Sequence, residues 1–174
     1  QSQSKQLKYI VALLLMLGCR KQELLKAKWE HIDLDRRSWK IPLSKSGKTR
    51  YIPLSSDAVE LLNELPRFRH CPYVLPNPKT LKPFCDFHAP WHTACRLAGL
   101  KDVRIHDLRH TFASMLVNAG QSLFVVSRAL GHANVAQTAR YSHLADDTLL
   151  AAADVAAKAM GNTWNTLKQN SEQP

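Results

Sequence analysis

The sequence lacks the long apolar run and the paired cysteines that mark membrane proteins and disulfide-stabilised proteins. Its longest apolar stretch, residues 9–17, is far shorter than the roughly 20 residues that a membrane-spanning helix needs. That stretch also lacks the charged flank and the cleavage site of a secretory signal. The four cysteines form no CxxC pair and no regular framework, which indicates free thiols. We therefore expect a cytoplasmic protein with no membrane partner.

Acidic residues are few beside the basic ones. The chain has 14 Asp and Glu against 24 Lys and Arg, so its formal net charge is +10. The excess is concentrated: residues 20–50 hold ten basic and four acidic side chains, a net +6, whereas residues 142–174 hold two and four, a net −2. A concentrated basic region favours a polyanionic partner such as nucleic acid over a basic surface kept only for solubility.

The pattern of apolar residues predicts one mostly helical domain with a small sheet. With 45% hydrophobic side chains, a chain of 174 residues can form the packed core of one domain. Short runs at 29–34, 38–43 and 50–54, separated by turn residues, predict three antiparallel strands joined by hairpins. We assign residues 1–162 to this domain and expect residues 163–174 to form a polar, flexible tail. Helices are predicted at 4–17, 21–28, 56–65, 84–97, 106–119, 122–130, 134–141 and from 146 or 147 to about 161.

Two arginines and a histidine suit the cleavage of a phosphodiester without a metal. Arg20 lies at the junction of two predicted helices, and Arg109 lies on a later helix, three residues after His106 and on the same face. A guanidinium donates two parallel hydrogen bonds and keeps its charge, so two arginines could hold both non-bridging oxygens of a phosphate. Arg20 alone could equally cap the preceding helix, which is the commoner role of a single arginine there.

Three further residues could complete such a site. Lys45 lies in a predicted hairpin turn, from which a long amine could reach into a groove, although a solvated turn lysine is commoner. His132 follows Gly131 at a predicted helix end. Tyr141 could act as a nucleophile, although a lone tyrosine is most often a packed aromatic.

A pair of histidines raises the question of zinc. His106 and His110 have i, i+4 spacing, which could place two ligands on one helix face. No glutamate occupies the metalloprotease position between them, and the cation of Arg109 would repel a metal. We therefore expect no metal and no organic cofactor.

In combination, five separated motifs resemble those of the tyrosine recombinases, the phage integrase family. The resemblance covers residues 7–160 and implies the catalytic fold of that family, which is mainly α with a small three-stranded antiparallel β-sheet. In chain order the motifs are GCRKQE at 18–23, Lys45 in its hairpin, HDLRHTFAS at 106–114, LGH at 130–132 and YSH at 141–143.

The resemblance implies a phosphate-binding role for four of these residues. Arg20 and Arg109 would clamp the phosphate, and His106 and His132 would hydrogen-bond to it. Glu23 matches an acidic position that supports the first motif and would help to hold its geometry.

The resemblance also implies the covalent chemistry. Tyr141 would attack phosphorus and form a 3′-phosphotyrosine bond, with His106 accepting its proton. Lys45 would act as general acid on the departing 5′ oxygen. His110 matches a common second histidine of its motif, for which a structural role is expected.

Partners follow from the same resemblance: double-stranded DNA, and other protomers of the same protein in a DNA-bound tetramer, with no small-molecule substrate. Family members carry an N-terminal DNA-binding domain that is absent from this chain, so weak DNA binding by the chain alone is expected. Two alternatives stay open: DNA relaxation like that of a type IB topoisomerase, and a catalytically inactive DNA-binding module of the same fold. The compact spacing between His132 and Tyr141 favours a recombinase, and competent residue types at all six catalytic positions favour activity.

Overall fold

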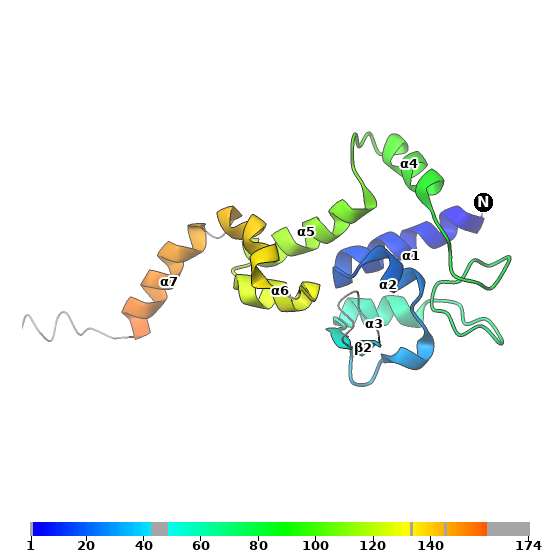
Figure 1. Ribbon diagram of the computed structural model, residues 1–174, viewed down its shortest axis with the longest axis horizontal. Helices are drawn as coiled ribbons and strands as arrows, with labels where there is room; N and C mark the ends of the chain where they lie inside the picture. The colour runs from blue at the N-terminus through cyan, green and yellow to red at the C-terminus, as the bar shows by residue number, and fades with distance from the viewer. Residues whose placement is uncertain (1, 43–48, 133, 145, 160–174) are drawn as a thin grey trace, which may run out of the picture.

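Helices dominate the fold, and one small sheet lies beside them (Figure 1). The computed structural model describes residues 2–42, 49–132, 134–144 and 146–159, so the predicted tail at 163–174 lies outside the described residues. The predicted fold class, mainly α with a three-stranded antiparallel sheet, is confirmed. The α-helices are α1 (Ser2–Leu17), α2 (Lys21–Leu25), α3 (Ser56–Asn63), α4 (His88–Leu97), α5 (Ile105–Asn118), α6 (Leu123–Leu130) and α7 (Asp146–Ala159). The 3-10 segments are η1 (Trp29–His31) and η2 (Val135–Leu144), and the strands are β1 (Ile32–Asp33), β2 (Ser38–Ile41) and β3 (Arg50–Pro53).

The first helix, α1, lies at the centre of the larger of two hydrophobic cores. Its apolar run buries Ile10, Leu13 and Leu14 almost fully, because α2, α3, α4 and α5 all pack against it. Gly18 follows the helix with a left-handed backbone (φ 55), a conformation that glycine adopts at little cost. The turn at Gly18 brings Arg20 to the start of α2.

The sheet alternates buried and exposed side chains, as the two-residue period of a strand requires. The strands pair in the order β1-β2-β3, and Trp39 of β2 lies opposite Ile52 of β3. Trp39, Ile41 and Ile52 are buried on the face toward the larger core. The first strand is shorter than predicted, because η1 replaces its start: the backbone N–H of Trp29 donates to the carbonyl of Pro72 rather than to the sheet.

One helix cap and one helix start differ from the predicted ones. α3 begins at Ser56, but its cap is Ser55 and not Ser56, since the Ser55 hydroxyl oxygen accepts a backbone N–H three residues on. The helix predicted from residue 84 begins at His88. This start places Pro90 in the first turn of α4, where its missing N–H leaves no helical hydrogen bond unmade.

Two other segments are shorter or tighter than predicted. α2 ends at Leu25, and the chain then enters an extended bridge in which the N–H of Val74 donates to the carbonyl of Ala27. The segment predicted as a helix from Asn134 is the 3-10 segment η2. Asn134 still caps it, because its side-chain oxygen accepts the N–H of Ala136.

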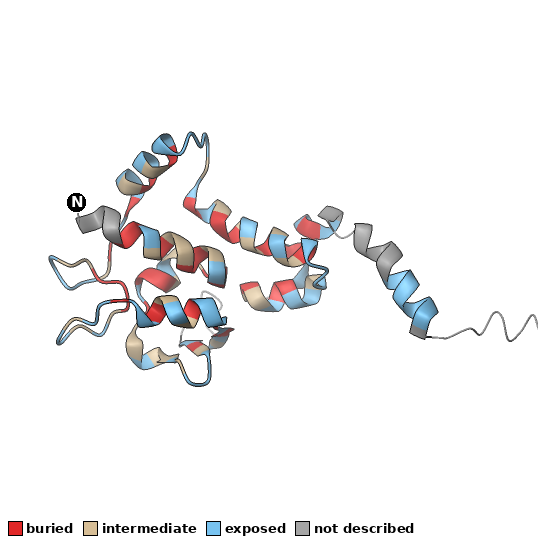
Figure 2. Ribbon diagram, turned by 180° about the vertical axis from the view of Figure 1, so that it is seen from behind, coloured by how far each residue is buried: buried red, intermediate tan, exposed pale blue. Residues whose placement is uncertain are grey.

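Two hydrophobic cores meet along α5. The larger core gathers buried residues from α1 to α4, the sheet and the first turns of α5 as far as Leu108. The buried members of the smaller core are Ala113, Val117, Val126, Leu130 and Tyr141. α5 contributes to both cores, with Leu108 in the larger one and Ala113 in the smaller one. Arg109 and His110 follow Leu108 and therefore lie where the two cores meet, a boundary that we call the seam. Figure 2 shows buried residues along α5.

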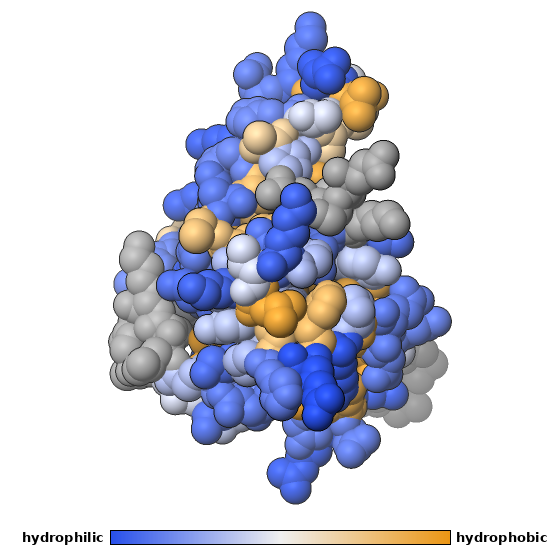
Figure 3. Space-filling model, turned by 90° about the vertical axis from the view of Figure 1, so that its right-hand side faces the viewer, coloured by the Kyte–Doolittle hydropathy of each residue, from blue (hydrophilic) through white to orange (hydrophobic). Residues whose placement is uncertain are grey.

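The face of the molecule that Figure 3 shows is mostly hydrophilic, and hydrophobic side chains gather on it only in small patches. Among the described helices, none combines the length and the apolar character needed to cross a membrane. α7 extends away from both cores and packs against η2 (Figure 1). The four cysteines are free thiols, as predicted.

Candidate active site

A buried arginine of α5 ties the two cores together. Arg109 is only 6% exposed. Its guanidinium donates hydrogen bonds of 2.7 Å to two carbonyl oxygens, that of Gly18 just after α1 and that of Leu130 at the end of α6. Carbonyls at helix ends carry partial negative charge, so a cation is favourable there. Burial and the nearby cations of Arg20 and Arg50 lower the pKa of Arg109 to about 10, which leaves it charged at neutral pH.

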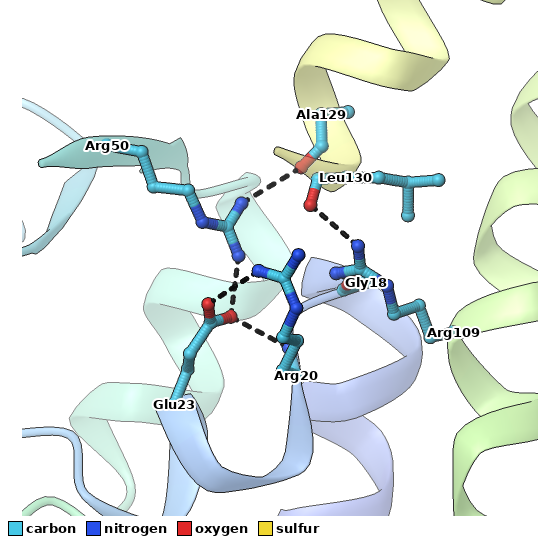
Figure 4. Close-up of polar contacts among 7 residues, drawn as sticks. All are labelled: Gly18, Arg20, Glu23, Arg50, Arg109, Ala129 and Leu130. Atoms are coloured by element: carbon cyan, nitrogen blue, oxygen red, sulfur yellow. Dashed lines mark hydrogen bonds and ion pairs between the residues drawn. The ribbon is translucent and has the colours of Figure 1, made fainter. Parts of the chain in front are cut away.

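Arg20, the other arginine of the predicted clamp, lies at the start of α2 beside Glu23 (Figure 4). Its backbone N–H donates to one carboxylate oxygen of Glu23 and its guanidinium to the other, both at 2.9 Å. These two bonds fix Arg20 against Glu23, the arrangement that the predicted supporting role of Glu23 requires. Burial disfavours the carboxylate, but the backbone N–H of Arg20 and the cation of Arg50 outweigh burial and hold the pKa of Glu23 below its ordinary value.

The structure adds an arginine that the sequence did not single out. Arg50 begins β3 and donates at 2.6 Å to Oε2 of Glu23, with a longer bond of 3.4 Å to the carbonyl of Ala129 on α6 (Figure 4). Its side chain is 13% exposed, and its buried Nε has no hydrogen-bond partner among the described residues. Its place in the basic region 20–50 was the one available hint, because no motif marks a lone arginine at a strand start.

His132 lies just beyond the end of α6, and its ring is held by a buried hydroxyl. Its Nδ1 lies 2.8 Å from Oγ1 of Thr138, a residue with 0% exposure that the sequence did not reveal. Burial lowers the pKa of His132 to about 4, and the cations of Arg109 and Arg20 are the next largest causes. The imidazole is therefore neutral at pH 7, with one ring N–H to donate. Arg109 bonds to the carbonyls of Gly18 and Leu130, which lie two residues before Arg20 and His132, so His132 and the two predicted clamp arginines lie in one region.

Tyr141 lies in η2 with its ring in the smaller core and its hydroxyl directed to the seam. The residue is 6% exposed, and its hydroxyl oxygen lies 2.6 Å from Nδ1 of His110. The predicted proton acceptor was His106, with His110 given a structural role; the hydroxyl contacts His110 instead. The two histidines are one helical turn apart, and His110 is the one nearer the segment of α5 that packs against η2. Burial raises the pKa of Tyr141, and the cations of Arg140 and Arg109 oppose that effect.

His106 lines a cavity of about 720 Å³ beside the sheet. Arg20 and Pro42 also line this cavity. Burial, followed by the charges of His110 and Arg109, lowers the pKa of His106, which favours a neutral ring at pH 7. The predicted general acid, Lys45, lies outside the described residues, but Pro42 stands three positions before it in the chain.

The side chains gathered at the seam suit an anion. In the described part of the chain, no group of three or more His, Cys, Asp or Glu side chains could hold a metal ion. The seam instead holds two cations, Arg20 and Arg109, and the neutral imidazole of His132. The hydroxyl oxygen of Tyr141, which could act as a nucleophile, lies beside His110. A phosphate oxygen is the kind of group that such donors bind.

Comparison with known proteins points to one family. Residues 1–148 match the family model described as the phage integrase family. The integrase of Salmonella phage P22 is 31% identical over 156 residues, which cover 82% of this chain and 40% of the relative. Tyrosine recombinase XerC of Staphylococcus carnosus is 33% identical over 150 residues, covering 80% and 50%. Among solved structures, the catalytic domain of bacteriophage HP1 integrase matches with a TM-score of 0.65 and 26% identity, covering 88% of each chain. The chain thus spans half the length, or less, of these two curated relatives.

Proposed function

Because the chain belongs to the phage integrase family, we propose that it is the catalytic part of a site-specific recombinase that cleaves and rejoins duplex DNA. One observation carries the proposal: Arg109 joins the chain just before Arg20 to the chain just before His132 through two carbonyls, and the Tyr141 hydroxyl lies beside His110. The names of the relatives, an integrase and a tyrosine recombinase, agree with this activity.

In this proposal the arginines hold the phosphate. Negative charge on the phosphoryl oxygens grows in the transition state, so cations that are already oriented stabilise it without reorganisation. Arg109 has both terminal nitrogens engaged by carbonyls, which orients its remaining N–H groups. Arg20 is oriented by Glu23 in the same way. His132 would donate its single ring N–H to the same phosphate.

We assign Tyr141 as the nucleophile. Its hydroxyl oxygen attacks phosphorus and forms the 3′-phosphotyrosine bond, while the bond from phosphorus to the 5′ oxygen breaks. A free phenol has a pKa of about 10, so about one in a thousand is ionised at pH 7 and a base is needed. The phenol proton passes to an imidazole, either that of His110, which the hydroxyl already contacts, or that of His106 one turn away.

The 5′ oxygen needs a proton as it departs, and we assign that step to Lys45. The residue precedes β3 and follows Pro42, which lines the cavity shared by Arg20 and His106. A 5′-hydroxyl from another strand would reverse the attack, so rejoining needs no external energy source.

We further propose that the active form is a DNA-bound tetramer of like protomers. Residues 152–158 of α7 are all exposed, and the helix extends away from both cores (Figure 1). A helix that makes few contacts with its own body is suited to pack on a neighbouring protomer.

Covalent trapping tests the proposed function. The probe is a pool of duplexes of randomised sequence, each nicked so that the short fragment bearing the 5′-hydroxyl diffuses away after cleavage and blocks rejoining. The native chain is expected to form a protein–DNA adduct that survives denaturation, and sequencing the trapped DNA gives the preferred site. Tyr141→Phe should give no adduct, whereas Tyr51→Phe, a control at a residue with 64% exposure, should retain it.

Three outcomes would count against the proposal. An adduct with Tyr141→Phe would move the nucleophile elsewhere. No adduct with the native chain, combined with binding of the random-sequence duplex, would favour the inactive DNA-binding module. Relaxation of a supercoiled plasmid without exchange between two sites would favour the topoisomerase alternative.

A further inference from the structure

We infer that Arg50 is a positioning residue: it holds the end of α6 that precedes His132 against the Arg20–Glu23 pair across the seam. The inference rests on the proposed function for its consequence in catalysis. It extends that function to a residue outside the predicted catalytic set.

The first argument is the pair of acceptors that Arg50 connects. One terminal nitrogen donates at 2.6 Å to Oε2 of Glu23, the same oxygen that accepts the backbone N–H of Arg20. The other lies 3.4 Å from the carbonyl of Ala129, three residues before His132 (Figure 4). One side chain from β3 therefore contacts both halves of the proposed phosphate site.

The second argument is how closely α6 approaches Arg50. Gly131 has φ 65, and a Cβ placed on it would lie 2.6 Å from Nη1 and 2.7 Å from Cδ of Arg50. The backbone that immediately precedes His132 therefore rests on the arginine side chain. If the Arg50 side chain moved, the backbone at Gly131 would lose its packing contact, and the position of His132 would change.

The third argument is energetic. Arg50 is 13% exposed, its Nε is buried without a partner among the described residues, and its bond to Ala129 is long. Burying a charged group with incomplete hydrogen bonding is costly, and an apolar side chain of similar size often stabilises such a place better. The contribution of Arg50 to folding stability therefore does not account for an arginine at this position. The two acceptors that its side chain joins account for it better. The planar fork of an arginine carries donors on two separate nitrogens, which here face acceptors on different elements, whereas the ammonium of a lysine is a compact point charge.

The test uses the chain with the duplex recovered by covalent trapping. Single-turnover adduct formation at saturating duplex and the Kd for that duplex are measured for Arg50→Gln and Arg50→Lys. A displacement of about 1 Å in a reacting group can cost on the order of 100-fold in rate, so we expect Arg50→Gln to slow the step by about 10- to 100-fold while Kd changes by less than about 3-fold. Arg50→Lys should stay at least about 10-fold slow, because it keeps the charge but loses the fork.

The matched control is Arg36→Gln, in the turn at the opposite end of β2, where the side chain is 87% exposed. It should react at the native rate. A native rate in either Arg50 variant would overturn the inference, and so would a loss confined to Kd, which would make Arg50 a DNA contact. If Arg50→Gln does not fold, Arg50→Lys decides the question by the same two measurements.

A measurement without DNA separates this inference from the proposed function. The cation of Arg50 is one of the charges that depress the pKa of His132, so the titration of the His132 ring by NMR should move upward in Arg50→Gln and stay unchanged in Arg36→Gln. An unchanged His132 titration in Arg50→Gln would count against the positioning role even if the native chain cleaves DNA. A native chain that forms no adduct would defeat the proposed function and leave this measurement intact.

Discussion

His132 illustrates how one hydrogen bond decides what a side chain can donate. At pH 7 its ring is neutral, because burial and neighbouring cations hold its pKa at about 4. A neutral imidazole has one N–H, so Nε2 is a donor when Nδ1 accepts a hydrogen bond and an acceptor when Nδ1 donates one. The partner of Nδ1 is the hydroxyl of Thr138, 2.8 Å away and fully buried. When Thr138 donates to Nδ1, the proton is on Nε2, where it is available for a phosphate oxygen.

Replacing Thr138 tests this tautomer argument. Thr138→Val removes the hydroxyl and nearly keeps the shape, so we expect adduct formation to slow by about 10-fold as the Nε2–H tautomer loses its partner. Thr111→Val is the matched control: the Thr111 hydroxyl also makes a 2.9 Å bond, to a carbonyl of its own helix, but on the exposed face of α5. Equal rates for native chain and Thr138→Val in the trapping assay would show that the hydroxyl does not select the tautomer.

The depressed pKa of His132 also makes stability depend on pH. Between the ordinary value of 6.5 and about 4 the unfolded chain binds more protons at this residue than the folded chain. Stability is therefore full above pH 6.5 and is lost as the pH falls toward 4. From pH 7 to pH 5 we expect His132 to account for a loss of about 1 to 2 kcal/mol in the free energy of unfolding.

Urea unfolding of the native chain and of His132→Asn at both pH values isolates this contribution. His106 and His110, whose pKa values are also lowered, act in the same direction in both proteins. The pKa of Glu23 is held below its ordinary 4.5, so this carboxylate stays largely ionised over the range. The same pH dependence in the two proteins would show that His132 titrates normally in the folded chain.

Among the helices, the end of α1 packs tightly against α5 at Gly18. A Cβ on this residue would collide with the ring of Phe112 on α5, and the backbone there has φ 55. The carbonyl of Gly18 also accepts one of the two bonds that hold Arg109. Because Gly18 has no side chain, α1 and α5 can pack closely there. The same glycine supplies a carbonyl that orients the buried Arg109.

Two glycine substitutions separate backbone strain from this collision. Gly99→Ala meets nothing within 4 Å but shares a positive φ of 69, so it should lose about 1 to 2 kcal/mol from the left-handed backbone alone. Gly18→Ala adds overpacking and should lose a further 1 to 3 kcal/mol or so, measured by urea unfolding. Equal losses in the two variants would mean that Phe112 moves aside freely.

Over the whole molecule, the distribution of charge and the packing of the two cores both contribute to the cationic region at the seam. The net charge is +10, and the basic excess is densest in residues 20–50, which supply Arg20 and Arg50 to the seam. The two hydrophobic cores share α5, so a residue at the seam is positioned by both of them. The cationic region is therefore held by packing on each side rather than by a loop.

Salt dependence tests the proposed DNA interface at this scale. Neutralising several phosphates releases counterions, so affinity for a random-sequence duplex should fall steeply between 50 and 200 mM salt, by about 1,000-fold if six phosphates are contacted. Fluorescence anisotropy of a labelled duplex measures this slope directly. A nearly flat dependence would argue against an extended interface and would leave the net charge without a DNA-binding explanation.

Local sequence signals were sufficient to predict which helices and strands exist. They gave the wrong boundary where a long-range contact decides where an element begins or ends. The helices predicted to end at residues 17, 119 and 130 are followed by Gly18, Gly120 and Gly131, each of which has a positive φ. The predicted start of α4 at residue 84 is wrong, because apolar residues before His88 continue the helical pattern of apolar positions although they lie outside the helix. Much of the first predicted strand is η1, because the backbone N–H of Trp29 donates to the carbonyl of Pro72, in a loop more than forty residues away. Apolar period and caps are local properties, whereas a hydrogen bond to a distant loop is not.

For the site, the chain order of motifs was sufficient to name Arg20, Arg109, His132 and Tyr141 as candidates, because each occurs beside recognisable neighbours in the sequence. Tertiary structure decided which atoms meet: His110 rather than His106 at the Tyr141 hydroxyl, and Thr138 at the His132 ring. It also decided that Arg50 joins the seam. These pairings join segments that lie on separate elements, and only the packing of two cores around α5 sets the distances between them. Residue types carry the chemistry, whereas the partner of each polar atom depends on which surfaces the fold brings into contact.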